Sequence, residues 1–399
     1  MKAIVITRLG GPEVLELREV PEPVMSAGQA LVRVQAGGLN FADLMTAQGG
    51  YPGTPKPPLV AGREFTGIEE STGRRVMGYT QWAAFAEKTS ARPDLLWPVP
   101  AGWSPEQAAA FPVNYFTAYF AYWEAGFLTG QARGNRVLIH AVAGGVGTAA
   151  VQIGKILGAE MYGTSSTDDK LARVKDLGLQ NAINYKERDY EEAIKEMTGG
   201  EGVDAAFEML GGEHTAKSIR CLRDFGKVIQ YGTATGKQPQ LDLRALYAKA
   251  ASVQGLWLTY LSSKHDLMEQ AWKHLSQWIA EDKLQPVIGH DQVARIAQDL
   301  FIVERCGLGF DFKCGSHHNL LWKFQCLETA ERSLATTTGR TTAAGAAAWH
   351  SRCRLKKHRL PASGDRRHYR NGITVFNRSR FFLQVANVLV IQVDVDERS

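Results

Sequence analysis

The sequence HAVAGGVGTAAVQIGK, residues 140–155, contains the glycine-rich loop that decides the fold prediction. It follows the apolar run 136–142, which predicts a buried strand, and it leads into an Ala-, Val- and Ile-rich segment, which predicts a helix. Backbone N–H groups and the positive dipole end at such a helix start attract a pyrophosphate. The order strand, loop, helix therefore predicts a dinucleotide-binding turn, although Val142 stands where the G-x-G-x-x-G fingerprint begins with glycine.

The residues after this loop alternate between predicted strands and predicted helices. Strands are expected at 159–165, 181–185, 204–210, 227–234 and 251–258, and helices at 148–158, 168–178, 190–200 and 214–226. Such alternation predicts a doubly wound parallel sheet with helices on both faces, assigned to residues 119–283. Residues 1–118 contain short β-rich runs separated by Gly and Pro, which predict a small all-β domain.

The positive net charge comes from the C-terminal part of the chain. Residues 314–399 contain 14 Lys and Arg against 6 Asp and Glu, whereas the first 313 residues contain 32 against 35. This tail includes the low-complexity stretch 337–349, the basic run 353–370 and the apolar, strand-like stretch 381–395. No pattern for a folded domain is evident, so the tail is expected to be disordered. It is either a true appendage or the product of read-through or a frame shift in the gene.

The composition favours a cytoplasmic protein. Charged residues occur from Arg8 onward, too early for the apolar middle of a signal peptide, and no stretch approaches the ~18 to 20 apolar residues of a membrane span. The five cysteines lack the regular spacing of a disulfide framework. We therefore expect a reducing compartment and no membrane partner.

The segment AVAGGVG, with Ala141, Gly144 and Gly147 each three residues apart, resembles a known fingerprint. It is that of the zinc-free, zeta-crystallin-like quinone oxidoreductase branch of the medium-chain dehydrogenase/reductase superfamily, where the first glycine is replaced. Further matches are GLNFADL (38–44), GREFTG (62–67), AAAFPVNYFTAY (108–119), INYKERDY (183–190), GGEGVDAAFEMLGG (199–212) and YGTATG (231–236). The resemblance covers residues 1–313. It implies a GroES-like catalytic barrel (1–118), a Rossmann NADPH-binding domain (119–283) and a return of 284–313 to the barrel.

The metal ligands of the zinc-dependent members of that superfamily are missing. Those enzymes need an early cysteine, a Gly-His-Glu segment and a four-cysteine lobe, whereas this chain has Asn40 in GLNFADL and Arg63 in GREFTG. Only Cys221 and Cys306 occur in the first 313 residues, too few for either type of zinc site. We therefore predict that the protein binds no metal.

The resemblance implies catalytic roles for three residues of the barrel. Asn40 matches an asparagine beside the nicotinamide, or is a turn residue, and Asp43 matches the family aspartate. Tyr51, in GGYPG, matches the tyrosine that related enoyl thioester reductases use near the substrate, or serves only the turn. Met45 occupies the position of the nearer tyrosine of many quinone reductases.

The resemblance also implies a cofactor site for NADPH. The second Rossmann strand ends in Ser165 and Ser166 without the acid that would bind an NAD ribose, unless Asp168 or Asp169 turns inward. Lys170 and Tyr185 match residues that hold the 2′-phosphate. The full set of implied cofactor residues is Thr117, Ala143, Gly144, Gly145, Val146, Gly147, Ser165, Ser166, Lys170, Tyr185, Tyr231, Gly232 and Thr233.

The function that the resemblance implies is zinc-free hydride transfer from NADPH to a quinone. One alternative is reduction of an activated alkene such as an enal, enone or enoyl thioester. A second alternative is an NADPH-binding protein that binds nucleic acid through the basic tail. The resemblance also implies a homodimer, formed through the apolar segment SVQGLWL at 252–258 as the edge strand of the parallel sheet.

Overall fold

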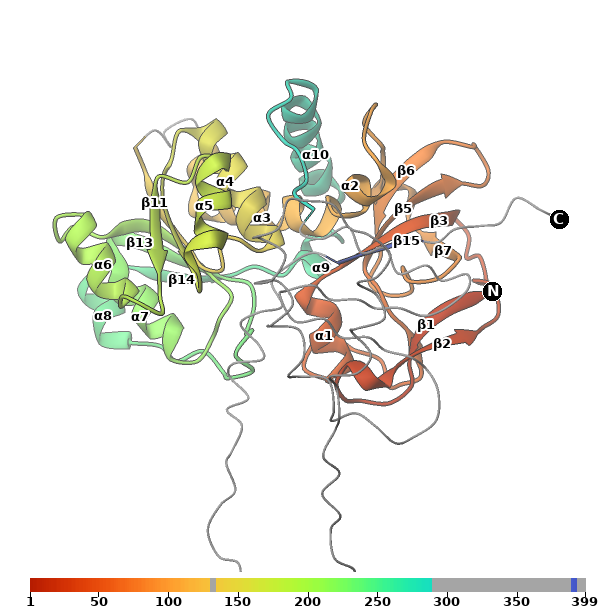
Figure 1. Ribbon diagram of the computed structural model, residues 1–399, viewed down its shortest axis with the longest axis horizontal. Coiled ribbons are helices and arrows are strands. Elements are labelled where there is room, and N and C mark those ends of the chain that lie inside the picture. The colour runs from red at the N-terminus through yellow and green to blue at the C-terminus, as the bar shows by residue number, and fades with distance from the viewer. Residues whose placement is uncertain (130–133, 289–388, 393–399) are drawn as a thin grey trace, which may run out of the picture. The chain divides into compact units, whose positions relative to one another are not determined.

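The computed structural model describes residues 1–129, 134–288 and 389–392 (Figure 1). Of the segment 284–313 that is expected to return to the barrel, residues 289–313 lie outside the described residues. The same holds for almost all of the tail 314–399 and for the nucleic-acid alternative that depends on it. Four tail residues are described, and they form strand β15 (Leu389–Gln392), which pairs antiparallel with β3 (Ala30–Leu39).

The N-terminal part is built from short antiparallel strands. Besides β3 these are β1 (Lys2–Ile6), β2 (Leu15–Glu19), β4 (Leu59–Val60), β5 (Glu64–Glu69), β6 (Arg75–Tyr79), β7 (Lys88–Ala91) and β8 (Leu96–Pro98). One sheet has the order β2-β1-β4, and the other has the order β15-β3-β5-β6-β8, with β7 also paired to β3. This is the architecture expected for a GroES-like domain. The associated helices are α1 (Phe41–Ala47), α2 (Pro105–Ala109) and α3 (Pro112–Ala125).

The second part is a six-stranded sheet in which all strand pairs are parallel. Its order is β11-β10-β9-β12-β13-β14, so β9 marks the point where the order along the sheet reverses. The strands are β9 (Arg136–Ile139), β10 (Glu160–Ser165), β11 (Asn181–Asn184), β12 (Val203–Glu208), β13 (Leu222–Gln230) and β14 (Ser252–Gly255). The helices are α4 (Gly145–Leu157), α5 (Asp168–Leu177), α6 (Tyr190–Met197), α7 (Glu213–Cys221), α8 (Leu243–Ala248), α9 (Leu258–Leu261) and α10 (His265–Ala280).

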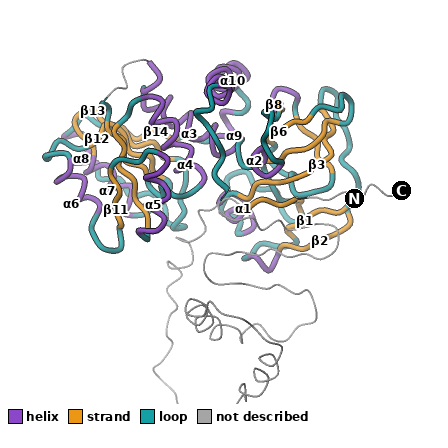
Figure 2. Tube along the Cα trace, turned by 45° about the horizontal axis from the view of Figure 1, so that its top comes forward, coloured by secondary structure: helices purple, strands orange, loops and turns teal. Residues whose placement is uncertain are grey.

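Helices cover both faces of this sheet, as the predicted doubly wound fold requires (Figure 2). Side chains of a strand alternate between the two faces. Val137 and Ile139 pack in the cluster that includes α3 and α4, whereas Leu138 between them packs with residues of α6 and α7. The continuous apolar run of β9 therefore reflects burial on both sides.

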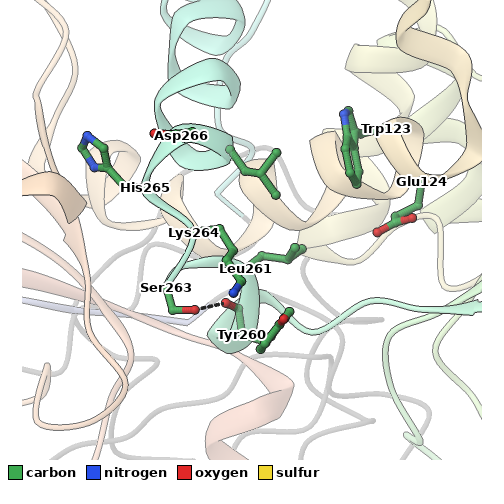
Figure 3. Close-up of a pocket in the computed structure, with 9 residues that line it drawn as sticks. Trp123, Glu124, Tyr260, Leu261, Ser263, Lys264, His265 and Asp266 are labelled. Carbon is green, nitrogen blue, oxygen red and sulfur yellow. Dashed lines mark hydrogen bonds between the residues drawn. The ribbon is translucent and has the colours of Figure 1, made fainter.

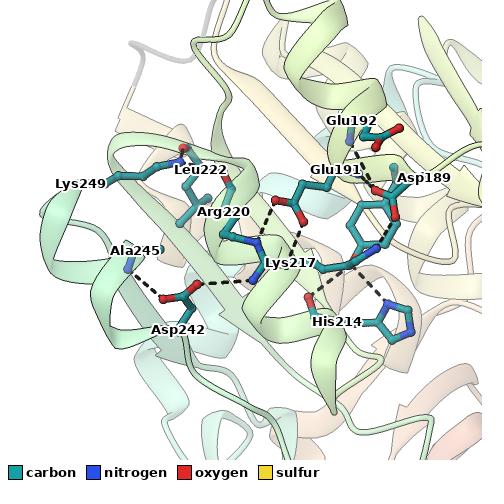
Figure 4. A network of polar contacts seen from close by, with 11 residues as sticks. Asp189, Glu191, Glu192, His214, Lys217, Arg220, Leu222, Asp242, Ala245 and Lys249 are labelled. Atoms are coloured by element: carbon teal, nitrogen blue, oxygen red, sulfur yellow. Dashed lines mark hydrogen bonds and ion pairs between the residues drawn. The ribbon is translucent and has the colours of Figure 1, made fainter.

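Salt bridges connect the three helices α6, α7 and α8 (Figure 4). Arg220 Nε lies 2.8 Å from Glu191 Oε1, and Arg220 Nη1 lies 3.4 Å from Asp242 Oδ2. Lys217 pairs with Asp189 at the start of α6. These exposed pairs contribute little stability each, but together they restrain α7, whose opposite side faces the sheet.

Helix α3 is buried over most of its length. Its residues Tyr115, Phe116, Tyr119, Phe120 and Tyr122 are at most 2% exposed, which is typical of a helix inside a core rather than at its surface. The Tyr115 hydroxyl donates to the carbonyl oxygen of Gln285 over 2.7 Å, which holds the chain after α10. Helix α3 continues through residue 118, after which the domain boundary is expected. The division of the chain into domains stays a prediction.

Two elements differ from their predictions. The strand expected over 251–258 is only Ser252–Gly255, because Leu256 and Leu258 turn into the core and Leu258 begins α9. The helix expected over 214–226 ends at Cys221, and the residues LRDFG that follow it belong to β13. The register between β12 and β13 shifts there, and Phe225 adopts a φ of 62° with its N–H bonded to the Lys249 carbonyl oxygen. Pairing with β12 and this long-range bond override the local preference for helix.

Candidate functional site

Helix α4 packs closely against the backbone of the loop that precedes it. A Cβ at Gly147 would lie 2.5 Å from the carbonyl oxygen of Val142, nearer than side-chain atoms can approach, so this position requires glycine. Val142 itself is fully buried, and it fills the space beside Gly163 of β10, where a Cβ would lie 2.8 Å from its methyl groups. The absence of a side chain at Gly163 leaves room for the valine at position 142. In this pair of contacting positions the glycine therefore lies in β10, and not at the start of the fingerprint.

The start of α4 supplies donors for an anion. The helix is capped by Gly144 in an extended conformation, and the N–H groups of its first turn, from Gly145, Val146 and Gly147, have no acceptor within the helix. The dipole adds a partial positive charge at the same place. Ala143 and Gly144 complete the loop, with the Gly144 N–H bonded to the Ala141 carbonyl oxygen over 2.8 Å.

The end of β10 lies beside this loop, because β10 pairs with β9. Ser165 and Ser166 are buried there, and the Tyr185 N–H donates to the Ser165 carbonyl oxygen over 3.1 Å. Burial raises the pKa of Tyr185, and a side-chain hydrogen bond with Ser166 opposes the rise. Lys170 is half-buried in the first turn of α5. The predicted 2′-phosphate residues therefore come from neighbouring segments at one edge of the sheet.

The two acidic residues near this strand end, Asp168 and Asp169, are both exposed. Asp168 accepts a hydrogen bond from the Asn184 amide over 3.1 Å, which directs its carboxylate toward β11.

Further along the same edge, Tyr231, Gly232 and Thr233 follow β13, and the Tyr231 N–H donates to the Glu208 carbonyl oxygen over 2.9 Å. Thr117 is buried on α3.

In the barrel, Asn40 and Asp43 form the start of α1. The Asn40 N–H donates to Asp43 Oδ2 over 2.8 Å, and the Asn40 Nδ2 donates to Glu64 Oε1 over 2.7 Å. Burial raises the pKa of Asp43 to about 6, although the Arg63 guanidinium and the Asn40 N–H oppose this rise. Asp43 thus fixes the turn that carries Asn40.

Glu64 is a functional candidate that the sequence analysis missed. Its side chain is fully buried, and its Oε2 accepts the Val113 N–H at the start of α3 over 2.7 Å. Burial raises its pKa to about 8, against the hydrogen bonds from Val113 and Asn40 and with a further contribution from the Asp43 charge. The available signal was an acid next to Phe65 at the start of the short strand EFTGIE, which is buried over most of its length.

Arg63 is sealed inside the barrel, only 1% exposed. Its Nη2 donates to Thr46 Oγ1 over 2.6 Å, and its Nε lies 3.6 Å from Asp43 Oδ1 without a hydrogen-bond partner. The guanidinium carbon lies 3.7 Å from the ring centroid of Tyr51 and 4.5 Å from that of Trp82. Arg63 therefore pairs with Asp43 and two aromatic faces, and it does not bind Glu64.

The Tyr51 hydroxyl is held by residues that follow β14. It accepts the Trp257 indole N–H over 2.9 Å and lies 3.0 Å from Thr259 Oγ1. The Tyr79 hydroxyl lies 2.9 Å from the same Thr259 oxygen. Sequence reasoning found Tyr51 but not Trp257 or Thr259, because more than 200 residues separate them along the chain.

An open hollow of about 670 Å³ lies between the end of α3 and the residues around the start of α10 (Figure 3). Trp123 and Glu124 line one side, and Tyr260 and Lys264 line another, with the Lys264 ammonium 4.7 Å from the Tyr260 ring centroid. None of the predicted site residues lines it. We therefore do not assign the cofactor to this hollow.

Two kinds of feature are absent from the part of the chain that the structure describes. Within 1–129, 134–288 and 389–392, no group of three or more His, Cys, Asp or Glu side chains could hold a metal ion. Among the helices of the same residues, none has the length and apolar character needed to cross a membrane.

The GroES-like part, the parallel sheet and the glycine loop at its point of reversal define an oxidoreductase of the medium-chain dehydrogenase/reductase class. Residues 145–281 match the family described as zinc-binding dehydrogenase, and residues 26–96 match the alcohol dehydrogenase GroES-like domain. The quinone oxidoreductase of Mus musculus is 32% identical over 306 residues, which are 73% of this chain and 90% of that protein. The chain belongs to the quinone oxidoreductase family of this superfamily.

Other relatives share the same region. The synaptic vesicle membrane protein VAT-1 homolog of Danio rerio is 33% identical over 72% of this chain, a match that spans 64% of that protein's length. The quinone oxidoreductase of Thermus thermophilus, solved also in complex with NADPH, is 36% identical with a TM-score of 0.66, covering 74% of this chain and 93% of that one. The CurK enoyl reductase is 25% identical with a TM-score of 0.65, covering 74% and 91%.

The buried carboxyls of Asp43 and Glu64 predict that stability falls as pH rises. Both have pKa values raised above those of an unfolded chain, so the stability linked to their protonated forms is present at low pH and is lost as pH passes about 6 and about 8. Between pH 6.5 and 8 Glu64 dominates, because the folded protein holds a proton there that the unfolded chain has released. The free energy of unfolding then falls by about 1.4 kcal/mol per pH unit. Glu64→Gln should flatten this slope.

Urea unfolding of the wild type and Glu64→Gln at pH 6.5, 7.0, 7.5 and 8.0 measures the effect. Glutamine cannot accept from both Asn40 and Val113, so Glu64→Gln also changes the free energy of unfolding at every pH. The test is therefore how steeply this free energy changes with pH, and not its absolute value. The exposed Glu187→Gln serves as a matched control and should keep the wild-type slope. Equal slopes for Glu64→Gln and the wild type would contradict the assignment.

Proposed function

We propose that this protein is an NADPH-dependent, zinc-independent reductase that passes hydride to a quinone. The observation that carries the proposal is the close contact of α4 with its loop at Gly147, which a pyrophosphate-binding turn needs. It is supported by the quinone oxidoreductases solved with NADPH among its structural relatives, from Thermus thermophilus and Escherichia coli.

The cofactor would be held by residues along the carboxyl edge of the sheet. The N–H groups of Gly145, Val146 and Gly147 suit the pyrophosphate, and the Lys170 ammonium suits a phosphate on the adenosine ribose. Ser165, Ser166 and Tyr185 offer hydroxyl groups from the neighbouring segments at the same edge of the sheet. The loop residues Ala143 and Gly144, together with Thr117, Tyr231, Gly232 and Thr233, complete the proposed set. When bound, NADPH supplies the hydride at its nicotinamide ring.

The barrel residues would shape the acceptor site rather than replace a metal. The Asn40 side-chain N–H groups bond to Glu64 Oε1 and, over 3.3 Å, to the Gly38 carbonyl oxygen, so we assign Asn40 to positioning. Asp43 fixes the same turn. Tyr51 is the candidate proton donor to a reduced carbonyl, since its hydroxyl accepts from Trp257 and its proton can go either to Thr259 Oγ1 or to a substrate oxygen.

Reduction of an activated alkene is the second candidate. Two enoyl reductases, CurK and JamJ, are among the solved structural relatives. The same residue Tyr51 favours this reaction, because protonation beside a thioester or ketone carbonyl needs a positioned acid.

A panel of acceptors distinguishes the two reactions. NADPH absorbance is followed with quinones, enones, enals and enoyl thioesters, each with and without a strong zinc chelator. Turnover of quinones that the chelator leaves unchanged is expected. Activity confined to enoyl thioesters would favour the second candidate, and activity lost to the chelator and restored by zinc would exclude zinc independence.

Lys170 should discriminate between the two nicotinamide cofactors. A hydrogen bond to a charged group contributes about 1.5 to 3 kcal/mol, so Lys170→Ala should weaken NADPH binding about tenfold to a hundredfold and leave NADH binding nearly unchanged. Fluorescence titration of both cofactors measures this. Lys175→Ala, at the exposed end of the same helix, is the control and should change neither. An equal loss for NADPH and NADH in Lys170→Ala would refute the assignment.

We also propose a homodimer through β14. β14 is an edge strand of the parallel sheet, and its residues Ser252, Gln254 and Gly255 are exposed. The neighbouring helix α8 exposes Leu243 and Tyr247. A lysine on an edge strand disfavours pairing with a second edge. Gln254→Lys should therefore shift the protein to monomers in light scattering, whereas Gln240→Lys should not. A monomeric wild type at micromolar concentration would exclude the dimer.

A further inference from the structure

Directly behind the glycine loop, four buried polar side chains form one continuous chain of hydrogen bonds. His140 follows β9, Thr164 lies in β10, Glu208 ends β12 and Ser218 lies on α7. Each is at most 1% exposed. None of them belongs to the residues assigned to the cofactor or to the reaction above, so their arrangement needs a separate explanation.

The distances connect the four residues in a fixed order. Thr164 Oγ1 lies 3.1 Å from His140 Nδ1, and His140 Nε2 lies 2.9 Å from Ser218 Oγ. Ser218 donates to Glu208 Oε2 over 2.8 Å. The other carboxylate oxygen, Oε1, accepts the N–H groups of Leu210 and Gly211 over 2.5 and 3.0 Å.

Proton counting gives this chain a direction. Burial lowers the pKa of His140 to about 3, so its imidazole is neutral and carries one N–H. Burial raises the pKa of Glu208, and the Ser218 hydroxyl and the N–H groups of Gly211 and Leu210 oppose this rise by hydrogen-bonding its charged form. With Glu208 ionised, Ser218 gives its proton to the carboxylate and its oxygen accepts from His140, which places the imidazole proton on Nε2. Nδ1 is then an acceptor and takes the proton of Thr164.

The chain connects the three loops that follow β9, β10 and β12. His140 immediately precedes the glycine loop, Thr164 immediately precedes Ser165 and Ser166, and Glu208 holds the two N–H groups of the loop after β12. We propose that Glu208 is a positioning residue that, through Ser218 and His140, fixes these loops in register for the dinucleotide and selects the Nε2–H form of His140. Its effect on cofactor binding rests on the function proposed above.

Glu208→Gln tests the direction while keeping the size of the side chain. The glutamine oxygen would accept from Leu210 and Gly211, and its NH₂ group would face Ser218 as a donor. Ser218 would then turn its proton toward His140 Nε2, and the imidazole would carry its proton on Nδ1, toward Thr164. The variant should therefore switch the tautomer of His140.

Long-range ¹H–¹⁵N correlation spectra of histidine-labelled protein, with His140 assigned by its loss in His140→Gln, report the tautomer in the free protein. We expect Nε2–H in the wild type, Nδ1–H in Glu208→Gln, and Nε2–H in Ser218→Ala, where the imidazole faces the carboxylate directly at 3.5 Å. A wild-type Nδ1–H, which a protonated Glu208 would produce, or an unchanged tautomer in Glu208→Gln, would overturn the proposal.

NADPH titration of the same proteins tests positioning. Loss of a buried hydrogen bond costs about 1 to 3 kcal/mol, so Glu208→Gln and Ser218→Ala should each bind NADPH about fivefold to a hundredfold more weakly. Thr198→Val, which removes a buried hydroxyl at the end of α6 outside this chain, should lower stability only. Wild-type affinity in both chain variants would overturn the positioning role. A wild type that binds no NADPH would refute the proposed function and with it the positioning role, while the tautomers still decide the direction of the chain.

Discussion

The distance between helix α4 and the loop before it depends on residue 147 having no side chain. With a Cβ 2.5 Å from the Val142 carbonyl oxygen, the helix would have to move away from β9. Its position in turn places the first-turn N–H groups at the carboxyl edge of the sheet, beside the ends of β10 and β12. Val142 and Gly163 form a second close contact, between the loop and β10, so the two contacts together fix the loop from both sides.

The barrel and the parallel sheet differ in the partners that they provide for buried polar side chains. Around β9 the buried groups form a directed chain from a hydroxyl to a carboxylate, with a neutral imidazole inside it. In the barrel, the fixed charge of Arg63 is matched to one carboxyl, Asp43, and to two aromatic faces, while Glu64 is buried without a cation. Burial raises the pKa of Asp43 to about 6 and that of Glu64 to about 8, so these two barrel groups respond to pH near neutrality.

The sequence allowed the prediction of the elements whose causes are local. The glycine loop, the strand–helix alternation and the serine-rich end of β10 follow from patterns a few residues long, and the fold confirms the doubly wound sheet. The contacts of Tyr51 with Trp257 and Thr259, and of Glu64 with Val113, join distant segments and leave no local pattern. The end of α7 was misplaced for the same reason, since pairing with β12 determines where β13 begins.

The surroundings of Arg63 limit how the barrel can change. A histidine at this position, as in the Gly-His-Glu segment of zinc-dependent relatives, would remove the only cation within ion-pair distance of Asp43 among the described residues and leave a lone carboxylate in the core. It would also withdraw the support under Tyr51 and Trp82. A metal-binding histidine at this position would therefore require further substitutions around Asp43, Tyr51 and Trp82 to keep the buried core satisfied.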